Sequence, residues 1–71
     1  MKNKPFTVKE FNEWREQMKI ESHYQTRDIL GVSYETVRKY ASREPPEALI
    51  PMYLTRCCQY YEALRDLEAF S

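Results

Sequence analysis

Few residues of this chain could do covalent chemistry or bind a metal ion. The 71 residues include one histidine, His23, and two adjacent cysteines, Cys57 and Cys58. Neighbouring cysteines rarely form a disulfide because the bridge strains the peptide between them, and a structural zinc site needs four ligands. No nucleophile stands at a recognisable spacing from a base, and there is no glycine-rich phosphate loop. We therefore expect two reduced thiols, no enzymatic activity, no metal and no cofactor.

A second kind of chemistry, recognition by hydrogen bonding, is available to residues 33–42. Val37, Tyr40 and Ala41 form an apolar stripe at helical spacing. The polar positions lie mostly off that stripe: Ser33, Tyr34, Glu35, Thr36, Arg38, Lys39. A helix with one buried stripe and a polar leading face is what the major groove of DNA admits. Base recognition by this segment is thus the first hypothesis to test.

The elements around that segment predict a helix-turn-helix. Ser22 and Gln25 form an S-x-x-Q capping box that starts a short helix over 22–30. Gly31 can end this helix in the left-handed conformation, and Ser33 is a good N-cap for the next helix, over 33–42. Two helices joined by a three-residue turn with glycine are typical of this motif, whose second helix enters the major groove.

A preceding helix is expected over 7–20 to support the motif. Thr7 and Glu10 form a T-x-x-E capping box, and Phe6 and Phe11 stand at the positions of a hydrophobic staple. The core-facing stripe continues at spacings of three and four with Phe11, Trp14 and Met18. Packing explains Trp14 better than a functional role.

The last helix is expected over 51–69, after the proline-rich break "SREPPE". One of its apolar stripes suits the core of the domain: Ile50, Leu54, Cys58 or Cys57, Tyr61. A second stripe has the four-three spacing of a coiled-coil seam: Tyr53, Cys57, Tyr60, Leu64, Leu67. A helix that is apolar on two sides needs two partners. The second is either a second subunit, which predicts a homodimer, or the first three helices, if these enclose the last one.

Size and charge are compatible with this organisation. The sequence predicts one all-α domain over 1–71, compact and with four to five helices, in which about 20–44 reads DNA and about 51–70 serves the core and dimerisation. Residues 1–43 carry a net charge of +3 and residues 44–71 a net charge of −3. The start "MKNKPFTVKE" lacks an apolar signal-peptide core, and no run is long enough to span a bilayer. We expect a cytoplasmic protein of a bacterial or phage-infected cell, without membrane association.

The segment "SHYQTRDILGVSYETVRKYASREPPEALIP" resembles the DNA-binding domains of small phage and bacterial regulators of the Cro and XRE type. The resemblance covers about residues 20–65. The features that carry it are Ser22 as cap, the run from Ile29 to Ser33, Thr36 with Val37, and Tyr40. It implies a homodimeric transcriptional repressor, in some cases an autoregulator, that binds an inverted repeat in double-stranded DNA. MerR-type regulators share a similar run, but the glycine-rich wing that would follow is missing here.

Three features depart from the family pattern. Arg27 stands where a small residue usually packs at the helix crossing, so we expect its side chain to reach solvent or to pair, with Glu35 as the candidate partner. Thr26 replaces a common leucine, and "SRE" after the second helix of the motif lacks a common glycine. These differences put the crossing angle of the two helices in question.

Positions in the motif assign the expected roles. The residues expected to meet base edges are Tyr34, Glu35, Arg38 and Lys39, with Ser33 and Thr36 at the margin. The residues expected near phosphate are His23, Tyr24, Gln25 and Arg43. The residues expected at the dimer interface are Tyr53, Cys57, Tyr60, Leu64 and Leu67. Each of these side chains could instead be an ordinary surface residue.

A small helical protein-interaction module is the main alternative function. A phage protein that binds and inhibits a host protein would suit the zero net charge and the two-faced last helix. A chain of this length also leaves little room for a pocket of about 300 Å3 or more, so no small-molecule ligand is expected.

Overall fold

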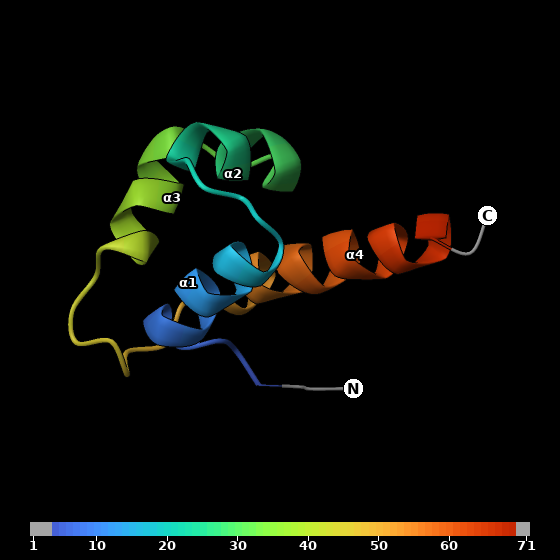
Figure 1. The fold of residues 1–71 in the computed structure, drawn as a ribbon. Helices are drawn as coiled ribbons and strands as arrows, with labels where there is room; N and C mark the ends of the chain where they lie inside the picture. The colour runs from blue at the N-terminus through green and yellow to red at the C-terminus, as the bar shows by residue number, and fades with distance from the viewer. Residues whose placement is uncertain (1–3, 70–71) are drawn as a thin grey trace.

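The structure is a computed structural model that describes residues 4–69, which form four helices and no strand (Figure 1). The helices are α1 (Val8–Gln17), α2 (His23–Leu30), α3 (Tyr34–Ala41) and α4 (Met52–Ala69). An isolated antiparallel bridge joins Thr7 to Leu49. The predicted compact all-α fold is confirmed; Phe70, in the expected last segment, lies outside the described residues.

The four helices divide the domain into two parts. In Figure 1, α2 and α3 lie together on one side of α1, and α4 runs past α1 and projects beyond the other helices. The domain measures 39 × 26 × 18 Å along its principal axes. No helix among residues 4–69 combines the length and the apolar content that crossing a membrane requires.

The helix starts and the central turn form as the local signals predict. Thr7 and Glu10 close their capping box with hydrogen bonds of 3.0 and 3.1 Å, and Ser22 and Gln25 close the second box. Gly31 ends α2 with φ of 71° and ψ of 26°, a left-handed conformation that costs an L-residue about 1–2 kcal/mol. The predicted ranges 22–30, 33–42 and 51–69 match α2, α3 and α4, and are slightly longer because they include the residues that flank each helix.

The first helix ends earlier than predicted, at Gln17 instead of Ile20. Lys19 adopts the left-handed region with φ of 59°. Its N–H donates to the carbonyl of Glu16, and the N–H of Ile20 donates to the carbonyl of Arg15. This is the hydrogen-bond pattern of a Schellman motif, here without the glycine that usually signals it. Ile20 leaves the helix and is buried in the core.

The core lies between α1, the end of α2 and the first half of α4. Its buried members are Val8, Phe11, Trp14, Ile20, Leu30, Ile50, Leu54 and Cys58. Phe6 and Met18 pack against this cluster, as the staple and the stripe of α1 predict. In α3, Val37 is fully buried, whereas Tyr40 and Ala41 are only half-buried. Tyr40, which was expected in the core, therefore packs against the core with part of its surface still exposed.

The buried side chain of Arg15 joins α1 to α2, and its neighbour Asn12 joins α1 to α3. Arg15 is only 9% exposed, and its guanidinium donates to Thr26 Oγ1 at 3.1 Å and to the carbonyl of Glu21 at 3.2 Å. It also donates to Asn12 Oδ1 at 3.1 Å. Asn12 in turn donates to the carbonyl of Ala41 at the end of α3. Burial lowers the pKa of Arg15, and these neutral oxygens replace the water that its charge has lost.

A second set of hydrogen bonds fastens the loop before α4 to the start of α1. The carbonyl of Phe6 accepts from Ile50 N–H at 2.9 Å, and its N–H donates to Thr55 Oγ1 at 2.9 Å. Val8 N–H donates to the carbonyl of Ala48 at 2.8 Å. These bonds satisfy backbone groups that the short helices leave unpaired, and they explain why a threonine is fully buried in α4.

We predict that Arg15→Ala lowers the free energy of unfolding by about 2 kcal/mol, because it leaves buried acceptors unpaired and removes the packing of a long side chain. Urea denaturation followed by circular dichroism measures this change. Arg15→Lys should recover only part of the loss, since an ammonium cannot form the same planar set of bonds. Arg56→Ala, at an exposed site on α4, is the control and should stay within about 0.5 kcal/mol of the parent. Equal stability of Arg15→Ala and the control would contradict the role assigned to Arg15.

Candidate nucleic-acid interface

The N-terminal ends of α2 and α3 meet on the outer side of the domain. The rings of Tyr24 and Tyr34 stack with centroids 4.6 Å apart and planes 29° apart. The ring of His23 lies 6.0 Å from the ring of Tyr34. The unpaired N–H groups of a helix start favour an anion, so two such starts side by side make this edge suited to a phosphate backbone.

The residues expected to read bases occupy the exposed side of α3. Ser33, Glu35, Arg38 and Lys39 are exposed, and Tyr34 and Thr36 are half-buried. The hydroxyl oxygen of Ser33 accepts from the backbone N–H of Thr36 and lies 2.7 Å from its hydroxyl. Both hydroxyls therefore contribute to the cap of α3. The long charged side chains and Tyr34 remain the groups best placed for recognition.

The residues expected near phosphate separate into two locations. His23 is half-buried and Tyr24 is 59% exposed at the start of α2. Gln25 uses its carbonyl oxygen to accept from the N–H groups of Glu21 and Ser22. Arg43 lies beyond the opposite end of α3, with its guanidinium 5.9 Å from the centroid of the Tyr40 ring. His23 and Tyr24 thus join the α3 start, and Arg43 does not.

Three cationic side chains on this side of the molecule lie against two aromatic rings. Lys39 Nζ lies 5.3 Å from the centroid of the half-buried Tyr40 ring that Arg43 also approaches. Arg27 lies over the ring of Tyr24, with its Cζ atom 5.4 Å from the centroid. Cation–π contacts at exposed sites are worth about 0.5–1 kcal/mol. They restrain the cations without neutralising them.

The expected pairing of Arg27 with Glu35 is wrong. Arg27 instead forms a salt bridge of 2.9 Å with its neighbour Asp28 and remains partly exposed. The reason is the orientation of α2, which buries Thr26 completely against Arg15. Because successive helical residues differ by about 100°, this orientation carries Arg27 out of the helix crossing.

His23 lies in an electropositive environment. Partial burial lowers its pKa below 6.5, and the positive charges of Arg15 and Arg38 lower it further. The free protein therefore holds His23 neutral at pH 7, with one ring N–H available as a donor. A phosphate placed beside it would act in the opposite direction and favour the charged imidazolium.

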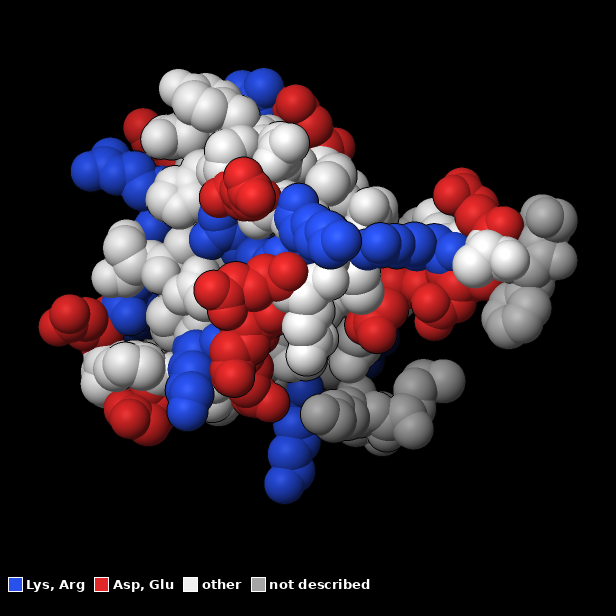
Figure 2. Space-filling view, viewed as in Figure 1, with Lys and Arg blue, Asp and Glu red and all other residues white. Residues whose placement is uncertain are grey.

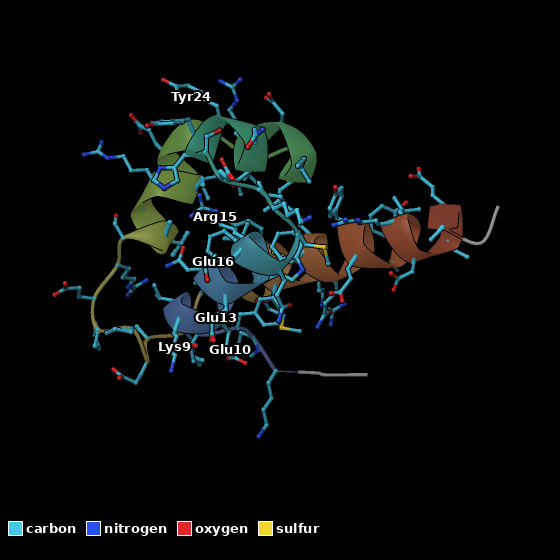
Figure 3. The ribbon with its side chains drawn as sticks, in the orientation of Figure 1. Lys9, Glu10, Glu13, Arg15, Glu16 and Tyr24 are labelled. Atoms are coloured by element: carbon cyan, nitrogen blue, oxygen red, sulfur yellow. The ribbon has the colours of Figure 1, made fainter. Side chains whose placement is uncertain are left out.

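Charge is mixed rather than uniformly positive over the side of the molecule that Figure 2 presents. Figure 2 shows acidic side chains gathered over the middle of the face that it presents, with Lys and Arg between and around them. Figure 3 places Glu10, Glu13 and Glu16 on α1 there, far from Tyr24. The candidate interface at the α2 and α3 starts is thus separated from this acidic row.

A groove beside α1 was not expected from the length of the chain. It has a volume of about 930 Å3 and lies between α1 and the loop that follows α3. The prediction of little room for a pocket is wrong because the loop bonds to the α1 backbone only near Val8 and Lys9. Its charged lining alternates in sign along the chain: Lys9, Glu13, Arg15, Glu16, Lys19, Glu21, Arg43, Glu44.

The second stripe of α4 faces away from the core. Tyr53, Tyr60, Leu64 and Leu67 are exposed, and only Cys57 is half-buried. The first three helices therefore do not enclose it. The other stripe is buried as predicted, with Leu54 and Cys58 fully covered and Tyr61 against Trp14. Burial raises the pKa of the Cys58 thiol to about 12, so this thiol is inert at neutral pH.

Sequence reasoning missed two contacts at this site. The pairing of Tyr24 with Tyr34 carries no local signal, because the two residues lie on different helices. Arg27 was expected to reach solvent or to pair, and its place over Tyr24 depends on how α2 is rotated. The remaining exposed positions of α3 follow from helical periodicity alone.

Comparison with known proteins leaves the family open: the chain matches no protein-family model, no curated protein and no solved structure. The resemblance of about residues 20–65 to phage and bacterial regulators stays a hypothesis.

Proposed function

We propose that this protein binds double-stranded DNA in a sequence-specific manner, as a homodimeric transcriptional repressor or autoregulator acting on an inverted repeat. The observation that carries the proposal is the meeting of the α2 and α3 starts, with Arg38 and Lys39 exposed along α3. In a helix-turn-helix, one helix start meets the phosphate backbone while the next helix lies in the major groove. This edge is separated from the acidic row on α1, which supports the placement of DNA against the starts of α2 and α3.

Each polar group of the edge then has a role in the complex. Arg38 and Lys39 donate to guanine or phosphate, and Glu35 accepts from cytosine N4. The N–H groups at the start of α2 and His23 contact phosphate. Arg43, held on the ring of Tyr40, contacts phosphate at the far end of α3.

The exposed stripe of α4 supports the homodimer. Tyr60 is 68% exposed and Leu67 is 66% exposed, on a helix that projects past the rest of the domain (Figure 1). Isolated helical turns are marginal in water, so a second copy packed along this stripe would stabilise them. The stripe lies on a different helix from the proposed DNA edge, so no residue is needed for both contacts.

The same stripe favours one alternative, a protein-interaction module. Exposed aromatic and leucine side chains in a row also suit a helix or groove of another protein. The two functions differ in which residues matter: DNA binding depends on α3, and a protein partner depends on Tyr60 and its neighbours.

We predict that selection from random duplexes at about 100 mM salt enriches an inverted repeat with half-sites about ten base pairs apart. Arg38→Ala and Lys39→Ala should each weaken binding to the selected duplex by about tenfold, because each removes a base or phosphate contact. Fluorescence anisotropy measures the affinity, and circular dichroism checks that the variants fold.

Two control variants remove the same charges elsewhere. Lys9→Ala lies on α1 far from Tyr24 (Figure 3), and Arg56→Ala lies on α4; both should bind within about twofold of the parent, since neither residue lies on α2 or α3. Failure of folded protein to enrich any sequence would reject DNA binding and favour the interaction module.

We predict that the protein sediments as a dimer at micromolar concentration, with twice the 8.6 kDa mass of the chain. Tyr60→Glu should produce monomer, because it places a charge in an apolar interface. Asp66→Ala, about 100° around α4 from Leu67, is the matched control and should leave the dimer intact. A monomeric parent protein would remove the dimer from the proposal.

We predict that DNA affinity rises as the pH falls from about 7.5 to about 5.5, because phosphate raises the pKa of His23 and the complex takes up a proton. His23→Gln should remove this dependence.

In the free protein the lowered pKa of His23 has the opposite consequence for folding. The unfolded chain binds the proton first, so the stability of the fold declines as the pH drops below 6.5. Circular dichroism at each pH separates the two effects, and an affinity that is flat with pH in the parent would place His23 away from phosphate.

A further inference from the structure

The stacked pair of Tyr24 and Tyr34 is not part of the hydrophobic core. Neither ring belongs to the buried cluster or to the side chains packed against it. Tyr24 is 59% exposed, although stacked rings usually bury their large apolar surface. The pair instead spans the junction between the second residue of α2 and the first residue of α3.

Contacts around the pair hold Tyr34 in a fixed position. Tyr24 lies against it at 4.6 Å, and His23 approaches its ring at 6.0 Å. Arg27 covers the ring of Tyr24 and is itself held by Asp28. A side chain that is already ordered loses less conformational entropy when it binds. Tyr34 is thus prepared for contact before any partner arrives.

The position of Tyr34 decides what it could contact. It is the first residue of α3, the end of a recognition helix that approaches base edges. Arg38, Lys39 and Glu35 supply hydrogen-bonding groups, whereas the Tyr34 ring supplies an apolar surface. The C5 methyl group of thymine is the apolar feature of the major groove, and aromatic side chains pack on it.

We propose that the ring of Tyr34 reads thymine through its C5 methyl group, and that Tyr24 is the positioning residue that holds this ring in place. The proposal rests on the proposed function and specifies it: each half-site contains a thymine opposite the start of α3. Tyr24 stacks against the reading residue, so its expected role shifts from phosphate contact to support of base recognition.

The test compares thymine with uracil, which lacks only the methyl group. Each thymine of the selected duplex is replaced singly by uracil, and affinities are measured by anisotropy with the full-length dimer. The affinity of the parent protein should fall about fourfold at one position of each half-site, because uracil lacks the methyl group whose burial stabilises the complex. Tyr34→Ala should abolish this uracil response, and Tyr24→Ala should reduce it at the same position.

Two variants separate positioning from general damage. Tyr24→Phe keeps the stack and should retain the full uracil response, even where Tyr24→Ala does not fold. Arg38→Ala should weaken binding overall and still retain the response, because it leaves the aromatic pair intact. If Tyr24 had a purely structural role, Tyr24→Ala would lower the stability of the protein without changing the ratio of its affinities for the thymine and uracil duplexes.

The outcomes also separate this inference from the proposed function. An operator in which every thymine tolerates uracil, or one that contains no thymine, overturns the inference and leaves DNA binding standing. A uracil response that survives Tyr34→Ala overturns it as well. If folded protein selects no duplex at all, the proposed function fails and the inference fails with it.

Discussion

The buried guanidinium of Arg15 is the contact on which the placement of α2 and α3 depends. A charged side chain that is largely removed from solvent is costly unless its N–H groups find acceptors. Thr26, Asn12 and the Glu21 carbonyl supply them. Because these acceptors come from α1, α2 and the connection between them, the charge is satisfied when α2 lies with Thr26 against α1; Asn12 then bonds to the end of α3.

That position accounts for the surface chemistry of the outer helices. With Thr26 facing Arg15, α2 presents Arg27 and Tyr24 to solvent and brings its start against the start of α3. Thr26 is thus the complement of the buried arginine. A polar core contact of this kind specifies orientation more narrowly than apolar packing does, since hydrogen bonds are directional.

The last helix differs between its two halves. Its first half fills the core with Leu54 and Cys58 and receives the N-terminal segment through Thr55. Its second half leaves the body of the domain with an apolar row still exposed. A domain of this size buries only about 60% of its unfolded surface. Covering that row in a dimer would therefore add substantially to a small core.

The sequence by itself determined the four helices, the N-caps of the first three, the turn at Gly31 and both stripes of α4, because these features depend on neighbours within a few residues. The polar face of α3 followed from the same periodicity. Only the tertiary structure decided that α1 ends at Gln17, that Arg15 is buried, that Arg27 pairs with Asp28 and that Tyr24 stacks on Tyr34. These last three depend on how one helix is rotated against another, and the early end of α1 depends on Ile20 entering the core. Such long-range packing leaves no periodic signal in the chain.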